Sequence, residues 1–174
     1  WSSDVCSSDL AYVPKDRDGE ALMMGASIQN NFCLPSVETL KGRFGFLSPK
    51  KLYQASSKAR EQFSVKSTGV DQLMRALSGG NKQKVNLGRW LIKDLDVLIV
   101  DCPTRGVDIG VKAYIYQCLR EAKEKGMAIL LITDELSEVL GMADTIAVMK
   151  DGEICKLLPR SAELSEETII EVMT

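Results

Sequence analysis

The apolar residues of this chain follow two spacings, which together predict a sheet of parallel strands covered by helices. Two short runs are continuously apolar, Val97 to Val100 and Met127 to Ile132, as is typical of buried parallel strands. Between them, apolar residues recur every three or four positions, as on one face of a helix: Val111, Ile115, Leu119 and Ala122. Gly126 is expected to end this helix, and a third strand is expected from Thr145 to Met149.

A short helix is expected at 136–142, before the third strand. This order of strands and helices predicts an α/β fold with right-handed crossovers between parallel strands. Ligands of such sheets bind outside the carboxyl ends of the strands. Asp101 ends the first apolar run, and Asp134 lies just past the end of the second. We therefore expect these two carboxylates to face the same crevice.

The part of the chain before this sheet predicts one short strand and several helices. Residues 11–13 are β-prone, and residues 17–25 are polar and expected to form a loop. Ser27 is placed to cap a helix that extends to residue 34, and a second helix is expected at 52–65. Between them, 41–49 should break regular structure. A third helix should follow Ser78, with one apolar face: Val85, Leu87, Trp90 and Leu91.

The end of the chain predicts a hairpin and a last helix. Lys150 to Glu153 is a tight-turn signal, so residues 154–158 should pair antiparallel with the strand at 145–149. Ser165 is expected to cap a helix that carries Glu166 and Glu167 in its first turn.

Composition is that of an ordinary globular protein, with 45% hydrophobic and 26% charged residues and a net charge of −2. This balance gives no bulk attraction to nucleic acid. The longest apolar run has six residues, whereas a membrane-spanning helix needs roughly 20, so the chain is not expected to cross a membrane by itself. Five cysteines without a C-x-x-C pair, and no histidine, argue against zinc or a disulfide framework and favour a reducing compartment.

The first ten residues, WSSDVCSSDL, do not fit the rest of the pattern. Ser-Ser-Asp occurs at 2–4 and again at 7–9, without a helical or strand period and without the apolar core of a secretory signal. We interpret residues 1–10 as a non-native or disordered junction. The alternative is a frayed natural terminus.

Two segments carry candidate chemistry. The segment Leu77 to Gln83 is expected to open a helix with Ser78, Gly79 and Gly80 in its first turn. Free backbone N–H groups and two glycines there would allow a phosphate to approach the backbone closely. The Ser78 hydroxyl can both cap the helix and donate a hydrogen bond to a phosphate oxygen. Taken alone, this string is better explained as a simple Ser/Gly turn and helix cap, because short Ser-Gly-Gly strings are common. The second segment begins at Asp101, which is placed to hold a magnesium-bound water beside nucleotide phosphates.

These segments resemble the motifs of ABC-type ATPases. LSGGNKQ at 77–83 resembles the ABC signature, VLIVD at 97–101 a Walker B strand, and PTRGVDIG at 103–110 the stretch that includes the D-loop. Three longer strings are similar to the second of two fused nucleotide-binding halves in ribose and galactoside importer ATPases: AYVPKDR at 11–17, RWLIKDLDVLIVD at 89–101 and EVLGMADTIAVMKDGEI at 138–154. The resemblance covers residues 11–174.

The chain also departs from that family's pattern. It contains no GxxxxGK[ST] loop, which should precede residue 11, so the resemblance implies an ABC nucleotide-binding domain without its P-loop strand. Cys102 stands at the position of the general-base glutamate, Asp134 at that of the switch histidine, and Lys15 at that of the Q-loop residue. Loss of a general base typically costs about 10²–10⁴ in rate. Cys102 as a redox-reactive thiol is disfavoured by the neighbouring Asp101.

The resemblance implies an asymmetric motor in which two halves enclose two ATP molecules. Ser78, Gly79, Gly80 and Gln83 would bind the ATP held by the partner half, whereas Asp101 (with Mg²⁺ through water), Cys102, Asp134 and Lys15 would belong to a degenerate site. Asp108 would couple the two sites, and Arg105 is assigned no catalytic role.

The resemblance also divides the chain and names its partners. Residues 27–74 would form a helical subdomain that contacts the membrane permease, 75–158 the ATPase core and 159–174 a C-terminal helix. The partners would be another nucleotide-binding half, fused upstream or in a dimer, permease subunits on the cytoplasmic face of the membrane and, indirectly, an extracellular sugar-binding protein. Without a P-loop, this chain alone is expected neither to bind ATP tightly nor to hydrolyse it.

Two alternatives remain open from the sequence. A soluble ABC ATPase of DNA repair or translation is disfavoured by the neutral charge and, for the repair type, by the short spacing from signature to Walker B. A non-catalytic accessory module would account for a chain without a P-loop. The transported solute is not identified, and nucleoside importers use similar ATPases.

Overall fold

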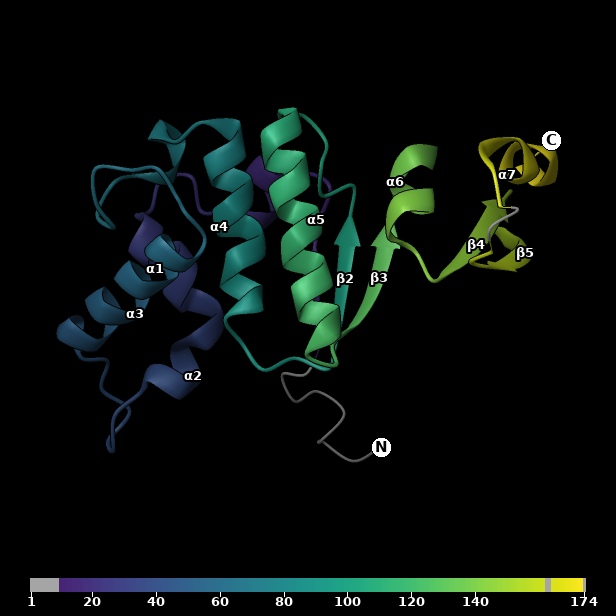
Figure 1. Ribbon diagram of the computed structural model, residues 1–174. Coiled ribbons are helices and arrows are strands. Elements are labelled where there is room, and N and C mark those ends of the chain that lie inside the picture. Colours follow the sequence, from purple (N-terminus) through teal and green to yellow (C-terminus); the bar gives the residue numbers. More distant parts are fainter. Residues whose placement is uncertain (1–9, 162–163, 174) are drawn as a thin grey trace. The chain divides into compact units, whose positions relative to one another are not determined.

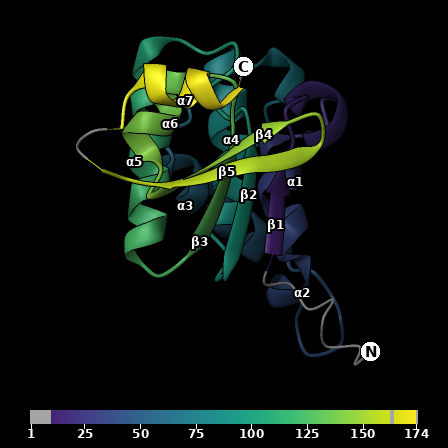
Figure 2. The same cartoon turned by 90° about the vertical axis from the view of Figure 1, so that its right-hand side faces the viewer.

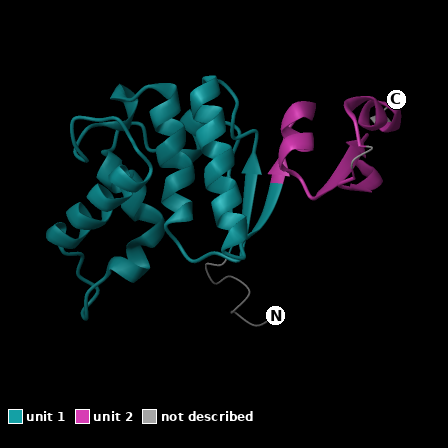
Figure 3. Cartoon of the chain, in the orientation of Figure 1, with its two compact units in different colours: residues 1–130 teal, residues 131–174 magenta. Residues whose placement is uncertain are grey.

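The computed structural model describes residues 10–161 and 164–173 (Figure 1). The interpretation of residues 1–10 as a junction falls almost wholly outside them. The chain divides into two compact units, residues 1–130 and 131–174 (Figure 3). The predicted boundaries at about residues 27, 74 and 158 differ from this division and stay predictions. None of the described helices is both long and apolar enough to span a bilayer.

The first unit is built on three neighbouring strands in the order β1 (Leu10–Val13), β2 (Val97–Asp101) and β3 (Ala128–Ile132), which lie side by side in Figure 2. β1 and β2 are parallel, and their register pairs Leu10 with Val97 and Tyr12 with Ile99. Side chains alternate between the faces of a strand, so these four residues share one face. The opposite face carries the buried Ala11, Val13, Leu98 and Val100.

Two long helices, α4 (Gly79–Leu91) and α5 (Ile109–Glu124), lie beside this sheet (Figure 1). α4 contacts both β1 and α5. On α5 the predicted helical periodicity is confirmed, because the buried residues Ile115, Leu119 and Ala122 are spaced four and three apart. On α4 the predicted apolar face is only partly buried: Val85 and Leu87 are buried, whereas Trp90 and Leu91 are half-buried.

The prediction that residues 127–132 form a buried strand is only half right. The strand exists, but Leu130 is 54% exposed, and on β1 Leu10 and Tyr12 are 59% and 45% exposed. β3 ends the described sheet, and α4 and α5 lie on one side of that sheet. On β1 and β2 buried residues alternate with exposed or half-buried ones, as expected of a parallel sheet covered on one side, whereas no residue of β3 is buried.

The segment between β1 and α4 is helical. It contains α1 (Ile28–Cys33), α2 (Val37–Leu40), α3 (Pro49–Gln62) and two 3₁₀ turns, Leu34–Ser36 and Met74–Ala76. Ser27 caps α1 as predicted, because its hydroxyl accepts a hydrogen bond from the Asn30 backbone N–H at 3.2 Å. Phe32 and Phe63 stack at 6.3 Å between ring centroids and join α1 to the end of α3.

The predicted loop at 17–25 is partly wrong, because Arg17–Ala21 forms a single π-helical turn. The Asp16 carboxylate accepts a hydrogen bond from the Gly19 N–H at 3.0 Å, and the Leu22 N–H donates to the Arg17 carbonyl at 2.9 Å. These local bonds close a turn that an apolar periodicity does not reveal.

The second unit contains α6 (Leu136–Met142), the hairpin of β4 (Thr145–Lys150) and β5 (Glu153–Pro159), and α7 (Glu166–Met173). The predicted hairpin turn is confirmed, with Asp151 and Gly152 both at positive φ, 51° and 84°. Ser165 caps α7 as predicted, since its hydroxyl accepts from the Thr168 N–H at 3.4 Å. The core of this unit consists of Ile146, Val148, Leu158 and Ile169.

Candidate functional site

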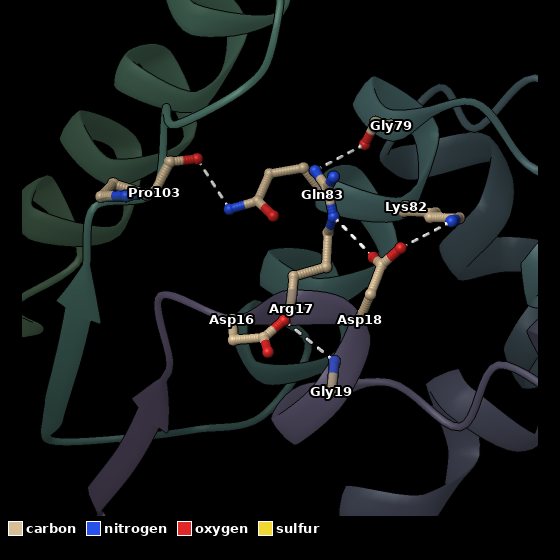
Figure 4. Close-up of polar contacts among 8 residues, drawn as sticks. All are labelled: Asp16, Arg17, Asp18, Gly19, Gly79, Lys82, Gln83 and Pro103. Atoms are coloured by element: carbon tan, nitrogen blue, oxygen red, sulfur yellow. Dashed lines mark hydrogen bonds and ion pairs between the residues drawn. The ribbon is translucent and has the colours of Figure 1, made fainter.

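The loop that follows β2 is hydrogen-bonded to α4, the helix that begins with the LSGG segment. Gln83, on the second turn of α4, is buried and donates a hydrogen bond from its side-chain amide to the Pro103 carbonyl at 2.7 Å (Figure 4). Cys102 is buried and adopts a left-handed φ of 46°, which is uncommon for a residue with a Cβ. Its carbonyl accepts from the Arg105 N–H at 3.1 Å, closing the turn after the strand.

The first turn of α4 is arranged differently from the prediction. Ser78 occupies the N-cap position, but its side chain makes no capping bond to the helix backbone. Instead the Asn81 amide donates to the Ser78 hydroxyl oxygen at 2.8 Å, and Asn81 also accepts from the Lys66 N–H at 2.8 Å. The exposed Ser78 hydroxyl therefore keeps its proton for an external acceptor, and no serine oxygen occupies the N–H groups of this turn.

The two signature glycines have different surroundings. A Cβ at Gly80 would come within 2.8 Å of the Val111 Cγ2 atom on α5. A Cβ at Gly79 would meet the Arg17 guanidinium at 3.5 Å and the Gly106 carbonyl oxygen at 3.7 Å, both ordinary contact distances. Gly80 is therefore required by helix packing, which is a structural reason for the glycine besides the approach of a phosphate.

A cluster of charged residues on the π-helical turn contacts the signature helix (Figure 4). Arg17 donates to the Gly79 carbonyl at 3.1 Å and pairs with Asp18 at 2.9 Å, and Lys82 pairs with the other Asp18 oxygen at 2.8 Å. Burial opposes ionisation of Asp18, but the hydrogen bonds from Lys82 and Arg17 outweigh it and lower the pKa of this carboxyl. Arg17 and Asp18 were not among the site residues predicted from the sequence, although Lys-Asp-Arg-Asp at 15–18 is a dense run of charges.

A cavity of about 440 Å³ opens between the π-helical turn, α4 and the loop after β2. Its lining consists of Lys15, Asp16, Arg17, Asp18, Gln83, Cys102, Arg105 and Gly106. The structure therefore brings together three of the predicted site residues, Lys15, Gln83 and Cys102. Ser78, Gly79, Gly80, Asp101 and Asp108 do not line it.

The remaining predicted residues lie around this cavity or apart from it. Asp101 ends β2 and accepts a hydrogen bond from the Tyr12 hydroxyl at 3.4 Å; partial burial, and then this carboxylate, raise the pKa of Tyr12. Asp108 is the N-cap of α5 and accepts from the Val111 N–H at 3.0 Å. Asp134 belongs to the second unit, so its predicted position opposite Asp101 stays a prediction.

The described carboxylates can hold a magnesium ion only if nucleotide phosphates and water supply most of its ligands. Within residues 10–161 and 164–173, no three Cys, Asp or Glu side chains gather closely enough to hold a metal ion. Mg²⁺ beside nucleotides takes one or two carboxylates and completes its shell with phosphates and water. Asp101 alone therefore meets the protein's share of such a site.

Comparison with known proteins identifies the family. Residues 3–105 match the family model described as ABC transporter, so this chain belongs to that family. Solved structures agree: the ATP-binding cassette MJ0796, in a dimeric post-hydrolysis state bound to ADP and Pi, superposes with a TM-score of 0.76 over 93% of this chain and 69% of that chain, at 18% identity. The fold is that of an ABC ATPase cassette.

Relatives among curated proteins are sugar-transport subunits. The chain is 41% identical over 152 residues to ribose import ATP-binding protein RbsA 1 of Streptomyces avermitilis, covering 87% of this chain and 29% of that protein. It is 37% identical over 172 residues to L-arabinose transport ATP-binding protein AraG of Geobacillus stearothermophilus, covering 99% and 33%. The chain thus spans about a third of the length of these relatives.

Proposed function

We propose that this chain is part of the ATP-binding motor subunit of an importer for sugars, and that it supplies the signature segment to ATP held by a partner half. The observation that carries the proposal is the first turn of α4. Its serine hydroxyl is exposed and leaves the helix backbone uncapped, and the adjacent glycines carry no side chain. Similarity to ribose and arabinose import ATP-binding proteins supports the solute class.

The chemistry of this turn suits a terminal phosphate. The helix N-terminus presents backbone N–H groups and the positive end of the helix dipole, and Ser78 adds a hydroxyl donor. Arg17 and Lys82 share Asp18, which fixes the start of α4 without using the N–H groups of the turn. These groups would bind and orient a phosphate presented by another cassette half.

The other side of the chain would form the degenerate nucleotide site. Asp101 would hold Mg²⁺ through water, and this ion would supply charge neutralisation to bound phosphates. Cys102, at the general-base position, is buried and in a strained conformation, and a thiol is a poor acceptor for a proton from water. Lys15 and Cys102 line one cavity, which supports their assignment to one site. Asp134 would occupy the switch position, and Asp108, through the N-terminus of α5, would couple the sites.

Partners and location follow from this role. The helical segment 27–74 would contact permease subunits at the cytoplasmic face of the membrane, with an extracellular sugar-binding protein acting through the permease. The ligands of the working protein would be ATP and Mg²⁺. Acting alone, this chain would be a non-catalytic module.

The experiment uses the complete motor subunit reconstituted with its permease, with ATP hydrolysis as the readout. Ser78→Glu places a negative charge against the expected phosphate and should reduce turnover at least about tenfold. Cys102→Ala should leave turnover within about twofold, because a degenerate base contributes little. Cys118→Ala, another buried thiol, is the matched control. Unchanged turnover in Ser78→Glu, or a large loss in Cys102→Ala alone, would contradict the assignment of the two sites.

A further inference from the structure

The loop between α2 and α3 carries large apolar side chains into solvent. Phe44 is 81% exposed and Phe46 is 76% exposed, and both lie at the tip of this loop. Figure 1 shows the loop extending away from the helices on either side of it. Soluble surfaces rarely carry neighbouring exposed aromatics without a partner.

The tip has a defined backbone conformation. Lys41 and Leu47 form an antiparallel bridge, and the Gly42 N–H donates to the Phe46 carbonyl at 2.9 Å. Gly45 turns the chain with a φ of 78°, and its N–H donates to the Gly42 carbonyl at 2.9 Å. Phe44 and Phe46 are therefore presented on either side of a turn that needs no binding partner to form.

The segment that contains the tip is rich in basic residues. Residues 39–60 contain six Lys and Arg and no Asp or Glu, although the chain as a whole has a net charge of −2. Four of these cations are exposed within the loop or the first turn of α3: Lys41, Arg43, Lys50 and Lys51. Lys41 pairs with Glu38 at the end of α2, and Arg43 lies over the Phe44 ring at 5.8 Å. Glu38 offsets the charge of Lys41, and Arg43, Lys50 and Lys51 leave an excess of positive charge near the aromatic tip.

We propose that this loop, residues 41–51, inserts its aromatic tip into the surface of a membrane that contains anionic lipids. Phe44 and Phe46 lie at the boundary between headgroups and acyl chains, and Arg43, Lys50 and Lys51 contact lipid phosphates. Peripheral proteins bind such membranes by inserting apolar side chains and by electrostatic attraction between basic side chains and anionic lipids. The exposed phenylalanines and the basic residues beside them provide both interactions. The proposal rests on the loop alone and does not depend on the proposed motor function.

Flotation of the full chain with lipid vesicles tests this. Binding to vesicles of phosphatidylcholine with about 30% phosphatidylglycerol is expected, and it should weaken as salt rises and be much weaker with phosphatidylcholine alone. Phe44→Ser with Phe46→Ser, and separately Lys50→Gln with Lys51→Gln, should each reduce binding at least about fivefold. Lys123→Gln with Lys125→Gln makes the same charge change on exposed residues near the end of α5 and should have no such effect.

Insertion is read out separately with Phe44→Trp. Its tryptophan emission, corrected for the unsubstituted chain, should shift to the blue on anionic vesicles and be quenched by brominated acyl chains. Binding that survives loss of both phenylalanines would show a charge contact without insertion and would overturn the proposal. Absence of binding to anionic vesicles would overturn it too. Circular dichroism of each variant checks that these exposed substitutions leave the fold intact.

Discussion

Replacement of Gly80 by alanine isolates the structural role of this signature glycine. The added Cβ would lie 2.8 Å from the Val111 Cγ2 atom, about 1 Å closer than an ordinary carbon contact. Overpacking of this kind costs about 1–3 kcal/mol, and the higher helix propensity of alanine returns at most about 1 kcal/mol. We therefore expect Gly80→Ala to lower the free energy of unfolding by about 1–2 kcal/mol.

The adjacent Gly79→Ala is the matched control, since its Cβ would come no closer than 3.5 Å to any neighbouring atom. It should stay within about 0.5 kcal/mol of the unsubstituted chain. Urea unfolding followed by fluorescence reports on the right unit, because Trp90 lies on α4. In the double variant with Val111→Ala, which removes the clashing methyl groups, the two costs should be non-additive by about 1 kcal/mol. Equal stabilities of Gly79→Ala and Gly80→Ala, or strict additivity with Val111→Ala, would refute this reasoning.

Three further predictions concern other parts of the chain. Because the folded-state pKa of Asp18 is lowered, its ion pairs stabilise the fold above its ordinary pKa of 3.8 and are lost as pH falls through the folded value. Asp18→Asn should therefore lower the free energy of unfolding in urea by up to about 1 kcal/mol at pH 7 and leave it unchanged at a pH where Asp18 is protonated. The same difference at all pH values would contradict this. Among the described cysteines Cys155 is exposed, whereas Cys33, Cys102 and Cys118 are buried. Cys155→Ser should therefore remove one fast-reacting thiol from the time course of a thiol titration, and an unchanged fast phase would contradict this. In the complete subunit, Cys102→Glu should raise ATP turnover, because it restores a carboxylate at the general-base position, and an unchanged rate would contradict this prediction.

Local signals in the sequence were sufficient for many elements. Ser27 caps α1 and Ser165 caps α7 because a serine side chain can reach the N–H three residues ahead, and that interaction depends on nearby sequence alone. The turn at Asp151 and Gly152 is equally local, because both positions require positive φ. The placement of Asp101 at the end of β2 follows from the apolar run that precedes it. The register of β1 with β2 was not predicted and comes from the structure.

What the sequence could not supply depends on contacts between distant residues. Ser78 was expected to cap its own helix, but Asn81 occupies its hydroxyl and is itself fixed by Lys66 from another segment. Arg17 reaches the Gly79 carbonyl across more than sixty positions, so no local pattern reveals it. The exposure of Leu130 likewise depends on what covers the sheet and not on the apolar run itself.

The central claim is that this chain gives its signature segment to ATP bound by another half. The direct measurement is ATP-dependent association of the chain with a cassette half that carries a GxxxxGK[ST] loop, taken from the ribose import relatives and followed by analytical ultracentrifugation. The account predicts association with ATP and Mg²⁺ that is lost in Ser78→Glu and retained in Cys102→Ala. Association that is independent of ATP, or unaffected by Ser78→Glu, would contradict it.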